Sequence, residues 1–239
     1  MKLFLTVTLF CFPLWAANYD FYAANKKSNA PVVIFVHGGA WISGSKDDYK
    51  ALGESLAKNG FCTAVAGYSL APVVKHPIQA EELDRIISDV STLKKKECNT
   101  NKIILVGHSA GAHMIAFWNT KYSNSAVKGF VGIEGIYDIV KIVKIWPSYK
   151  DWFIVSEFGD SAGWAAASPA LLPIKSKAPW LLFHSNKDER VDFAQTEDFK
   201  NKLSKEKVAV KLVTLKDENH FGAIEAATGS KEIKMFIGR

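Results

Sequence analysis

The sequence contains no apolar run long enough to cross a membrane, no internal repeat and no low-complexity linker, and each absence narrows what the chain can be. The longest apolar run, residues 3–15, falls short of the about 20 residues that a membrane-spanning helix needs, so we expect no stable membrane anchor. Without a repeat or a linker, 239 residues suit one α/β domain with a single sizeable core. The sequence presents no cluster of metal-binding side chains, so we expect neither a metal nor a cofactor.

The N-terminus has the pattern of a secretory signal peptide. Lys2 precedes the apolar run, and small Ala16 and Ala17 follow it before polar residues begin. We therefore predict a signal peptide at residues 1–17, one domain at residues 18–239, and a secreted or periplasmic protein.

Cysteine is scarce, and removal of the signal peptide would leave only Cys62 and Cys98. An even number of cysteines in an oxidising compartment permits a disulfide. Two unpaired thiols remain the alternative, because the sequence gives no separation between the two Cα atoms.

The chain carries a net charge of +6 and a pI near 9.0, values that also occur in proteins that bind nucleic acid or an anionic surface. Its lysines, however, gather at residues 94–96 and 200–211, where they fit the solvated faces of helices and of the strand that follows. We therefore expect a small-molecule substrate and no nucleic acid, while the oligomeric state stays undetermined.

The pattern of apolar residues predicts a doubly wound α/β fold with a mostly parallel sheet. Several apolar runs are continuous, as burial on both faces of a parallel sheet requires, and helical patterns at 47–59 and 79–96 alternate with them. Residues 137–173 lack a clean period, and we interpret them as a small cap over the pocket. The predicted strands are residues 32–36, 61–68, 102–107, 127–133, 180–184 and 208–215.

The most specific motif is Gly-His-Ser-Ala-Gly at residues 107–111, directly between a predicted strand and a predicted helix. Strand, tight turn and helix are the context that a nucleophile elbow requires, and they outweigh a chance occurrence of the motif. We therefore predict Ser109 as the nucleophile, with the N-terminus of the following helix directed at the substrate.

A second motif, His-Gly-Gly-Ala-Trp at residues 37–41, follows the first of these strands. A glycine pair there allows the backbone to turn its N–H groups into the site, although ordinary strand-to-helix turns also use glycine. Together with the elbow, the motif predicts an oxyanion hole formed by the N–H groups of Gly39, Ala40 and Ala110.

Six histidines compete for the role of general base, and we predict His220. It follows the last predicted strand, in the chain order Ser, acid, His. Of the others, we expect His108 to face away from the site, His113 to be packed and His37 to order the oxyanion loop.

The acid that orients the histidine must lie at a strand end between Ser109 and His220, and we predict Asp188. Four other carboxylates stay open at this point. Two lie close by, and two follow the preceding strand, where some hydrolases carry their acid. These alternatives are Glu189, Asp192, Glu134 and Asp138.

Over about residues 31–221 these motifs resemble α/β hydrolases that include kynurenine formamidases and bacterial esterases related to feruloyl esterases. Tyr-Ser-Leu-Ala-Pro at 68–72, Gly-Ile-Tyr-Asp at 135–138 and Asn-His-Phe at 219–221 extend the likeness. The resemblance implies hydrolysis of a small ester or an aryl formamide without a cofactor. The short stretch before residue 31 implies that leading edge strands are missing or shortened. A secretion signal fits poorly with tryptophan catabolism, so we rank esterase above formamidase.

Aromatic side chains near the motifs are candidates for an apolar wall of the substrate pocket. We predict Trp41 and Tyr137 for this role, with Trp146 or Trp164 as further candidates, although core packing explains each of them equally well. Two other function classes stay open, a non-catalytic binding protein of the same fold and a peptidase.

Overall fold

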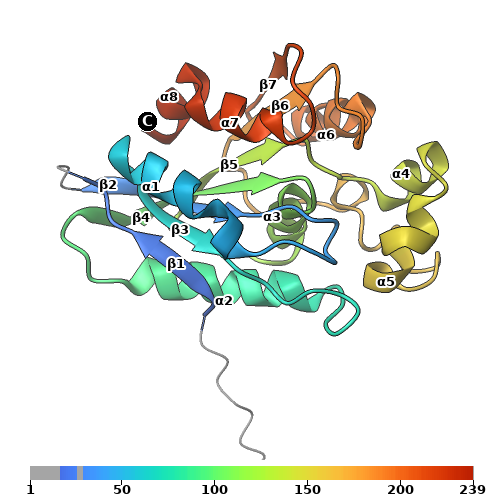
Figure 1. Cartoon of the computed structure of the whole chain (residues 1–239), viewed down its shortest axis with the longest axis horizontal. Coiled ribbons are helices and arrows are strands. Elements are labelled where there is room, and N and C mark those ends of the chain that lie inside the picture. The colour runs from blue at the N-terminus through green and yellow to red at the C-terminus, as the bar shows by residue number, and fades with distance from the viewer. Residues whose placement is uncertain (1–16, 26–28, 239) are drawn as a thin grey trace, which may run out of the picture.

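The computed structural model describes residues 17–25 and 29–238, so the predicted signal peptide lies almost entirely outside the described residues. Within them, seven strands form one sheet in the order β1-β3-β2-β4-β5-β6-β7 (Figure 1). Only β1 runs antiparallel to its neighbour, and every other pair is parallel. The strands are β1 Tyr19–Tyr22, β2 Ala30–Val36, β3 Cys62–Ala66, β4 Cys98–His108, β5 Val127–Ile133, β6 Trp180–Ser185 and β7 Val210–Leu215.

Helices cover both faces of this sheet, which confirms the predicted fold class (Figure 1). One face packs against α1, α7 and α8, and the other against α2, α3 and α6. The α-helices are α1 Lys50–Lys58, α2 Ile78–Thr92, α3 Ala110–Lys121, α4 Ile139–Ile145, α5 Val155–Phe158, α6 Phe193–Lys205, α7 Gly222–Gly229 and α8 Lys231–Gly238.

Strand β2 illustrates why its sequence is continuously apolar. Val32 and Ile34 belong to the core on one face of the sheet, whereas Val33 and Phe35 belong to the core on the other. Because successive side chains of a strand point to opposite faces, burial of both faces requires every position to be apolar.

The strand order places the carboxyl ends of β2 and β4 at the point where the direction of winding changes. The chain passes from β2 to β3 on one side, and after α2 it crosses to β4 on the other side of β2. Crevices at such a switch point are where open α/β sheets bind ligands. The loop after β2 and the turn after β4 carry the two glycine motifs, so both motifs meet at this point.

The two cysteines of the described residues form a disulfide, with their Cα atoms 5.8 Å apart. Cys62 begins β3 and Cys98 begins β4, and the two strands flank β2. The bridge therefore joins the amino ends of two strands that are not themselves paired.

Differences from the predicted elements lie at their ends. The leading edge strand β1 has four residues, in keeping with the expected shortening, and β4 begins at Cys98, four residues before the predicted strand. The helical pattern at 47–59 splits into a 3-10 turn, η1 Lys46–Tyr49, and α1, which ends before Gly60 at a φ of 88°. Within the described residues, no helix is long and apolar enough to span a membrane.

The segment predicted as a cap, residues 137–173, consists of short helical pieces. Besides α4 and α5 it contains a π-helix, η2 Lys150–Ile154, and a 3-10 turn, η3 Pro169–Leu171. Three of its residues, Tyr149, Trp152 and Phe153, border the pocket at the switch point, so part of the segment lies beside the pocket.

Candidate active site

Ser109 occupies a strained turn between β4 and α3, with φ 52° and ψ −117°. A side chain rarely adopts this conformation, and it persists only where the surroundings enforce it. At this turn the backbone segments pack too closely to leave room for side chains on the two flanking glycines. A Cβ added to Gly107 would lie 2.4 Å from the carbonyl oxygen of Gly111, and one added to Gly111 would lie 2.1 Å from that of Val36. The two glycines of the motif therefore allow the strand and helix to approach closely enough to form the elbow.

The loop after β2 also has an unusual backbone. Gly39, Ala40 and Trp41 have positive φ values of 117°, 52° and 60° in succession. The carbonyl oxygen of Gly39 accepts hydrogen bonds from the N–H groups of Ile42 and Ser43, at 3.1 and 3.0 Å. This turn brings Gly39 and Ala40 to the same pocket as Ser109.

His37 and Tyr68 hold this loop from behind. The two rings stack with their centroids 4.2 Å apart, and the Tyr68 hydroxyl donates to the carbonyl oxygens of His37 and Gly38. A Cβ added to Gly38 would lie 2.7 Å from Nδ1 of His108, so the loop packs directly on the elbow. His37 therefore packs against the loop that carries Gly39 and Ala40, the position from which it would order a predicted oxyanion hole.

His220 lies on the loop between β7 and α7 and lines the same pocket as Ser109. Its Nδ1 atom lies 2.8 Å from Oδ2 of Asp188, whose side chain is only 1% exposed. Because a carboxylate can only accept, Nδ1 carries the proton, and Nε2 is left free to accept one. The structure thus brings together the predicted base and the predicted acid from two different loops.

Asp188 is held as a charged group. Its Oδ1 atom accepts hydrogen bonds from the N–H groups of Arg190 and Val191, at 2.8 and 3.0 Å. Burial acts to raise the pKa of Asp188, but hydrogen bonds from His220, Glu134 and Arg190 outweigh it and hold the pKa well below the usual range. The carboxylate therefore stays ionised and able to orient the imidazole.

The four alternative acids have other contacts. Asp138 and Asp192 cap helices, accepting from the N–H groups of Lys141 and Ala194. Glu189 accepts a hydrogen bond from the backbone N–H of His220 at 3.3 Å, so this contact is with the main chain of His220 and not with its imidazole ring. Glu134 is fully buried beside Asp188 and His184.

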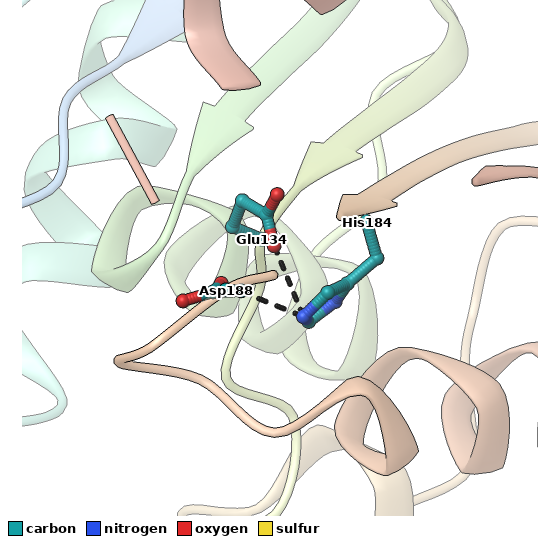
Figure 2. Close-up of side chains that lie close together, drawn as sticks. All are labelled: Glu134, His184 and Asp188. Atoms are coloured by element: carbon teal, nitrogen blue, oxygen red, sulfur yellow. Dashed lines mark ion pairs between the residues drawn. The ribbon is translucent and has the colours of Figure 1, made fainter. Parts of the chain in front are cut away.

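Glu134, His184 and Asp188 form the one group of three metal-binding residue types found within the described part of the chain (Figure 2). Nε2 of His184 lies 3.0 Å from Oε2 of Glu134 and 3.5 Å from Oδ2 of Asp188. The same nitrogen donates to the carbonyl oxygen of Val191 at 2.9 Å, while Nδ1 lies 2.6 Å from the hydroxyl of Thr196. A carbonyl oxygen can only accept, so this nitrogen carries a proton and has no lone pair for a metal.

His108 differs from its prediction, because it is among the residues that line the pocket and its ring packs beside that of His220. Its ring centroid lies 4.7 Å from that of His220, and Nε2 donates to the backbone carbonyl oxygen of His220 at 3.0 Å. Burial and the neighbouring His220 lower the pKa of His108 to about 3. His108 is therefore a neutral hydrogen-bond donor that holds the loop of His220 in place. His113 is buried at 1% exposure, as expected.

The two predicted substrate contacts require correction. Trp41 is fully buried and packs edge-on against His113 and Phe158, and Tyr137 is fully buried and stacks on Phe199 with ring centroids 4.1 Å apart. Neither borders the pocket, because both belong to the core on the face of the sheet that packs against α2, α3 and α6.

Other apolar side chains, from the cap and the neighbouring loops, line the pocket instead. Trp152 and Phe221 are more than half exposed at its mouth, and the guanidinium of Arg190 lies 5.1 Å from the centre of the Phe221 ring. Sequence reasoning missed these residues because no local pattern separates an exposed aromatic of a cap from a buried one. The apolar lining residues are Ile136, Tyr149, Trp152, Phe153, Val191 and Phe221.

Comparison with known proteins gives consistent matches. A family model described as BD-FAE matches residues 19–203. The chain is 32% identical over 130 residues to a kynurenine formamidase of Danio rerio, covering 52% of this chain and 43% of that protein. It is 26% identical over 213 residues to a kynurenine formamidase of Salmo salar, covering 86% of this chain and 71% of that protein.

Among solved structures, a thermophilic esterase of Thermogutta terrifontis with propionate bound superposes with a TM-score of 0.72. It shares 17% sequence identity, with 92% of this chain and 88% of that chain covered. This likeness shows that the chain has the α/β-hydrolase fold.

Proposed function

The chain belongs to the BD-FAE family, and from that premise we propose that it hydrolyses small carboxylic esters, with Ser109, His220 and Asp188 as its catalytic triad. One observation carries the proposal. The hydrogen-bonded pair of His220 and Asp188 lies at the pocket that Ser109 enters from a strained elbow. A serine, an imidazole and a buried carboxylate in this relation are the parts that acyl transfer to water needs.

The proposed reaction proceeds in two halves. His220 accepts the hydroxyl proton of Ser109 through Nε2 while the serine oxygen attacks the ester carbonyl carbon. The oxyanion is stabilised by the N–H groups of Gly39, Ala40 and Ala110. His220 then protonates the leaving alcohol, which leaves an acyl group on Ser109. Water, deprotonated by His220, attacks this acyl group and releases the acid, so that Ser109 regains its proton.

An aryl formamide is the alternative substrate. The similar proteins from Danio rerio and Salmo salar are named kynurenine formamidases, and the aromatic lining of the pocket suits a flat ring. Formamide and ester hydrolysis share the attack on a carbonyl carbon and the acyl-enzyme, so one triad serves either substrate. The two substrates differ in the leaving group that His220 must protonate, which is an alcohol for the ester and an aryl amine for the formamide.

The proposal includes export of the chain, as a secreted or periplasmic protein. Support comes from the charged, apolar and small-residue segments of residues 1–17 and from the disulfide between Cys62 and Cys98. Disulfides persist in oxidising compartments and are rare in the reducing cytosol. This placement favours the ester over the formamide, because tryptophan catabolism is cytosolic.

A substrate panel tests the proposed function. Purified protein is assayed with short p-nitrophenyl esters, an aryl formamide and a peptide amide, and labelled with a fluorophosphonate probe followed by mass spectrometry. We expect ester hydrolysis and labelling of Ser109 alone, both lost in Ser109→Ala. Formamide turnover with little ester turnover would favour the alternative. Wild-type activity in Ser109→Ala would overturn the assignment, and inactivity towards the whole panel would favour a binding protein.

A further inference from the structure

Glu134 is a buried acid that the proposed reaction does not use. It directly follows β5, and its φ of 50° is close to that of Ser109. Its backbone N–H donates to the carbonyl oxygen of Phe183 at 3.0 Å, which extends the pairing of β5 with β6. The side chain is fully buried and points at Asp188 and His184 (Figure 2).

The two oxygens of Glu134 have unequal surroundings. Oε1 accepts a hydrogen bond from the N–H of Ser185 at 2.9 Å. Among the residues that the structure describes, no donor is directed at Oε2. Although Nε2 of His184 is 3.0 Å away, its N–H is directed at the carbonyl oxygen of Val191. An ionised oxygen that is buried without a donor is costly, so Oε2 is best satisfied when it carries a proton of its own.

Asp188 supplies the acceptor for that proton. It receives hydrogen bonds from His220, Arg190 and Val191, whereas Glu134 receives one, from Ser185. Two neighbouring carboxylates in a low-dielectric interior do not both ionise, and the charge resides on the one with more donors. The charge therefore belongs to Asp188 and the proton to Glu134.

We propose that Glu134 is a positioning residue for the triad: as a neutral carboxylic acid it donates a hydrogen bond to Asp188 and holds that carboxylate against His220. This inference rests on the proposed function, because Glu134 can position the triad only if Asp188 orients a catalytic histidine. Burial, the hydrogen bond to Asp188 and the charge of Asp188 raise the pKa of Glu134 to about 10, in agreement with the geometry.

Two variants separate this role from a structural one. Glu134→Gln keeps a donor for Asp188 and an acceptor for Ser185, whereas Glu134→Leu keeps neither. We expect kcat of Glu134→Gln to stay within about threefold of the wild type. For Glu134→Leu we expect kcat to fall by about 10- to 100-fold, the loss expected for a hydrogen bond to a charged group. Because Glu134 does not line the pocket, KM for the same ester should change less than about twofold.

Glu157 offers a matched control. It is also a buried glutamate, and its partner is Gln79, whose Nε2 donates to it at 2.8 Å, away from Asp188. Glu157→Leu should lower Tm and leave kcat near the wild-type value. Wild-type kcat in Glu134→Leu would overturn the proposal. Equal damage by Glu134→Gln and Glu134→Leu would also overturn it, because an ionised carboxylate, as at a metal detected by elemental analysis, would then be required.

A second measurement needs no disruptive variant and no catalysis. The free energy of unfolding of the wild type and of Glu134→Gln is measured from about pH 5 to pH 9. A neutral Glu134 takes up a proton on folding above its ordinary pKa of 4.5, so wild-type stability should fall relative to the variant as the pH rises. The groups that face Glu134 occur in both proteins and cancel in the difference: Asp188, His184, Glu189 and Tyr137.

A difference that does not change with pH would overturn the neutral state of Glu134. This readout also separates the two proposals. A wild-type protein inactive on every ester and formamide would refute the triad, while the stability difference would still report whether Glu134 is protonated beside Asp188.

Discussion

Nδ1 of His220 and Oδ2 of Asp188 lie 2.8 Å apart, although 32 residues separate them in the chain. The two residues follow adjacent parallel strands, β6 and β7, and therefore emerge at the same edge of the sheet. Further hydrogen bonds tie their loops together, including one from the Ser185 hydroxyl to the carbonyl oxygen of Glu218 at 2.6 Å. The pair is thus held in place by contacts between the two loops that carry it.

Asp188→Asn should lower kcat by about 10⁴-fold, because an amide favours the wrong tautomer of His220 and cannot stabilise an imidazolium. The controls are Glu189→Gln and Asp192→Asn, which alter the nearest alternative acids and should stay within about tenfold of the wild type. Steady-state kinetics on one p-nitrophenyl ester measures all three. A larger loss in either control than in Asp188→Asn would identify a different acid.

Gly39→Ala should abolish most activity. At its φ of 117° a Cβ would lie 2.0 Å from the carbonyl oxygen of Ser43, so the loop must move and carry the N–H groups of Gly39 and Ala40 out of place. Loss of one oxyanion donor costs about 10²- to 10³-fold in kcat. The matched control is Gly163→Ala, where the nearest atom lies 3.5 Å from the added Cβ. Near-normal kcat in Gly39→Ala would exclude this loop from the oxyanion hole.

The positions of the three proposed triad residues depend on a local turn and on strand order, which the sequence reveals, while their catalytic roles stay predictions. Ser109 lies in a motif whose glycines are needed by the backbone, and His220 and Asp188 follow strands recognisable by their apolar runs. Parallel strands bring such loop residues to one edge, so chain order is enough to pair them.

Residues whose role depends on tertiary packing could not be predicted. Trp41 directly follows Ala40 in the loop after β2, yet the positive φ values of this loop turn its ring into the core. His108 has its position fixed by a carbonyl group 112 residues away, on the loop of His220. The protonation proposed for Glu134 depends on its contact with Asp188, which lies on the loop after the next strand, and no spacing along the chain reveals that contact.

Substitutions of Trp152 and Trp41 test which of the two tryptophans contacts the substrate. Trp152 is 57% exposed at the pocket mouth, so Trp152→Ala should change the free energy of unfolding by less than about 0.5 kcal/mol. It should raise KM for an aromatic ester about 2- to 10-fold, from the loss of one ring contact. Trp41→Ala should instead cost about 3–5 kcal/mol of stability and leave the ratio of KM values for aromatic and acetyl esters unchanged. The reverse pattern would restore Trp41 as the substrate contact.

The disulfide should contribute to stability. It closes a loop over a sequence separation of 36, for which the chain-entropy model gives about 4 kcal/mol. Replacing Cys62 and Cys98 together by alanine should therefore lower the free energy of unfolding by up to that amount, as measured by denaturant titration. Because neither cysteine lines the pocket, kcat of the folded variant should remain near that of the wild type. Equal stability of the two proteins would mean that the bridge adds nothing to the fold.

Glu157 gives a pH dependence of stability with a definite sign. Burial raises its pKa from 4.5 to about 8, although hydrogen bonds from Gln79 and from the backbone at His76 act in the opposite direction. Between these values the folded protein holds a proton that the unfolded chain has lost. Folding therefore takes up a proton, and the free energy of unfolding must fall as the pH rises through this range.

Glu157→Gln cannot titrate, so the difference in stability between the wild type and this variant should decline from about pH 4.5 towards pH 8 and then level off. Denaturant unfolding at several pH values measures it, and kcat on the p-nitrophenyl ester should be unaffected because Glu157 does not border the pocket. For Glu134, whose pKa is raised to about 10, the corresponding decline should continue to higher pH. A stability difference that stays constant between about pH 4.5 and pH 8 would mean that Glu157 is ionised in the folded protein, with Gln79 and the His76 backbone stabilising its charge.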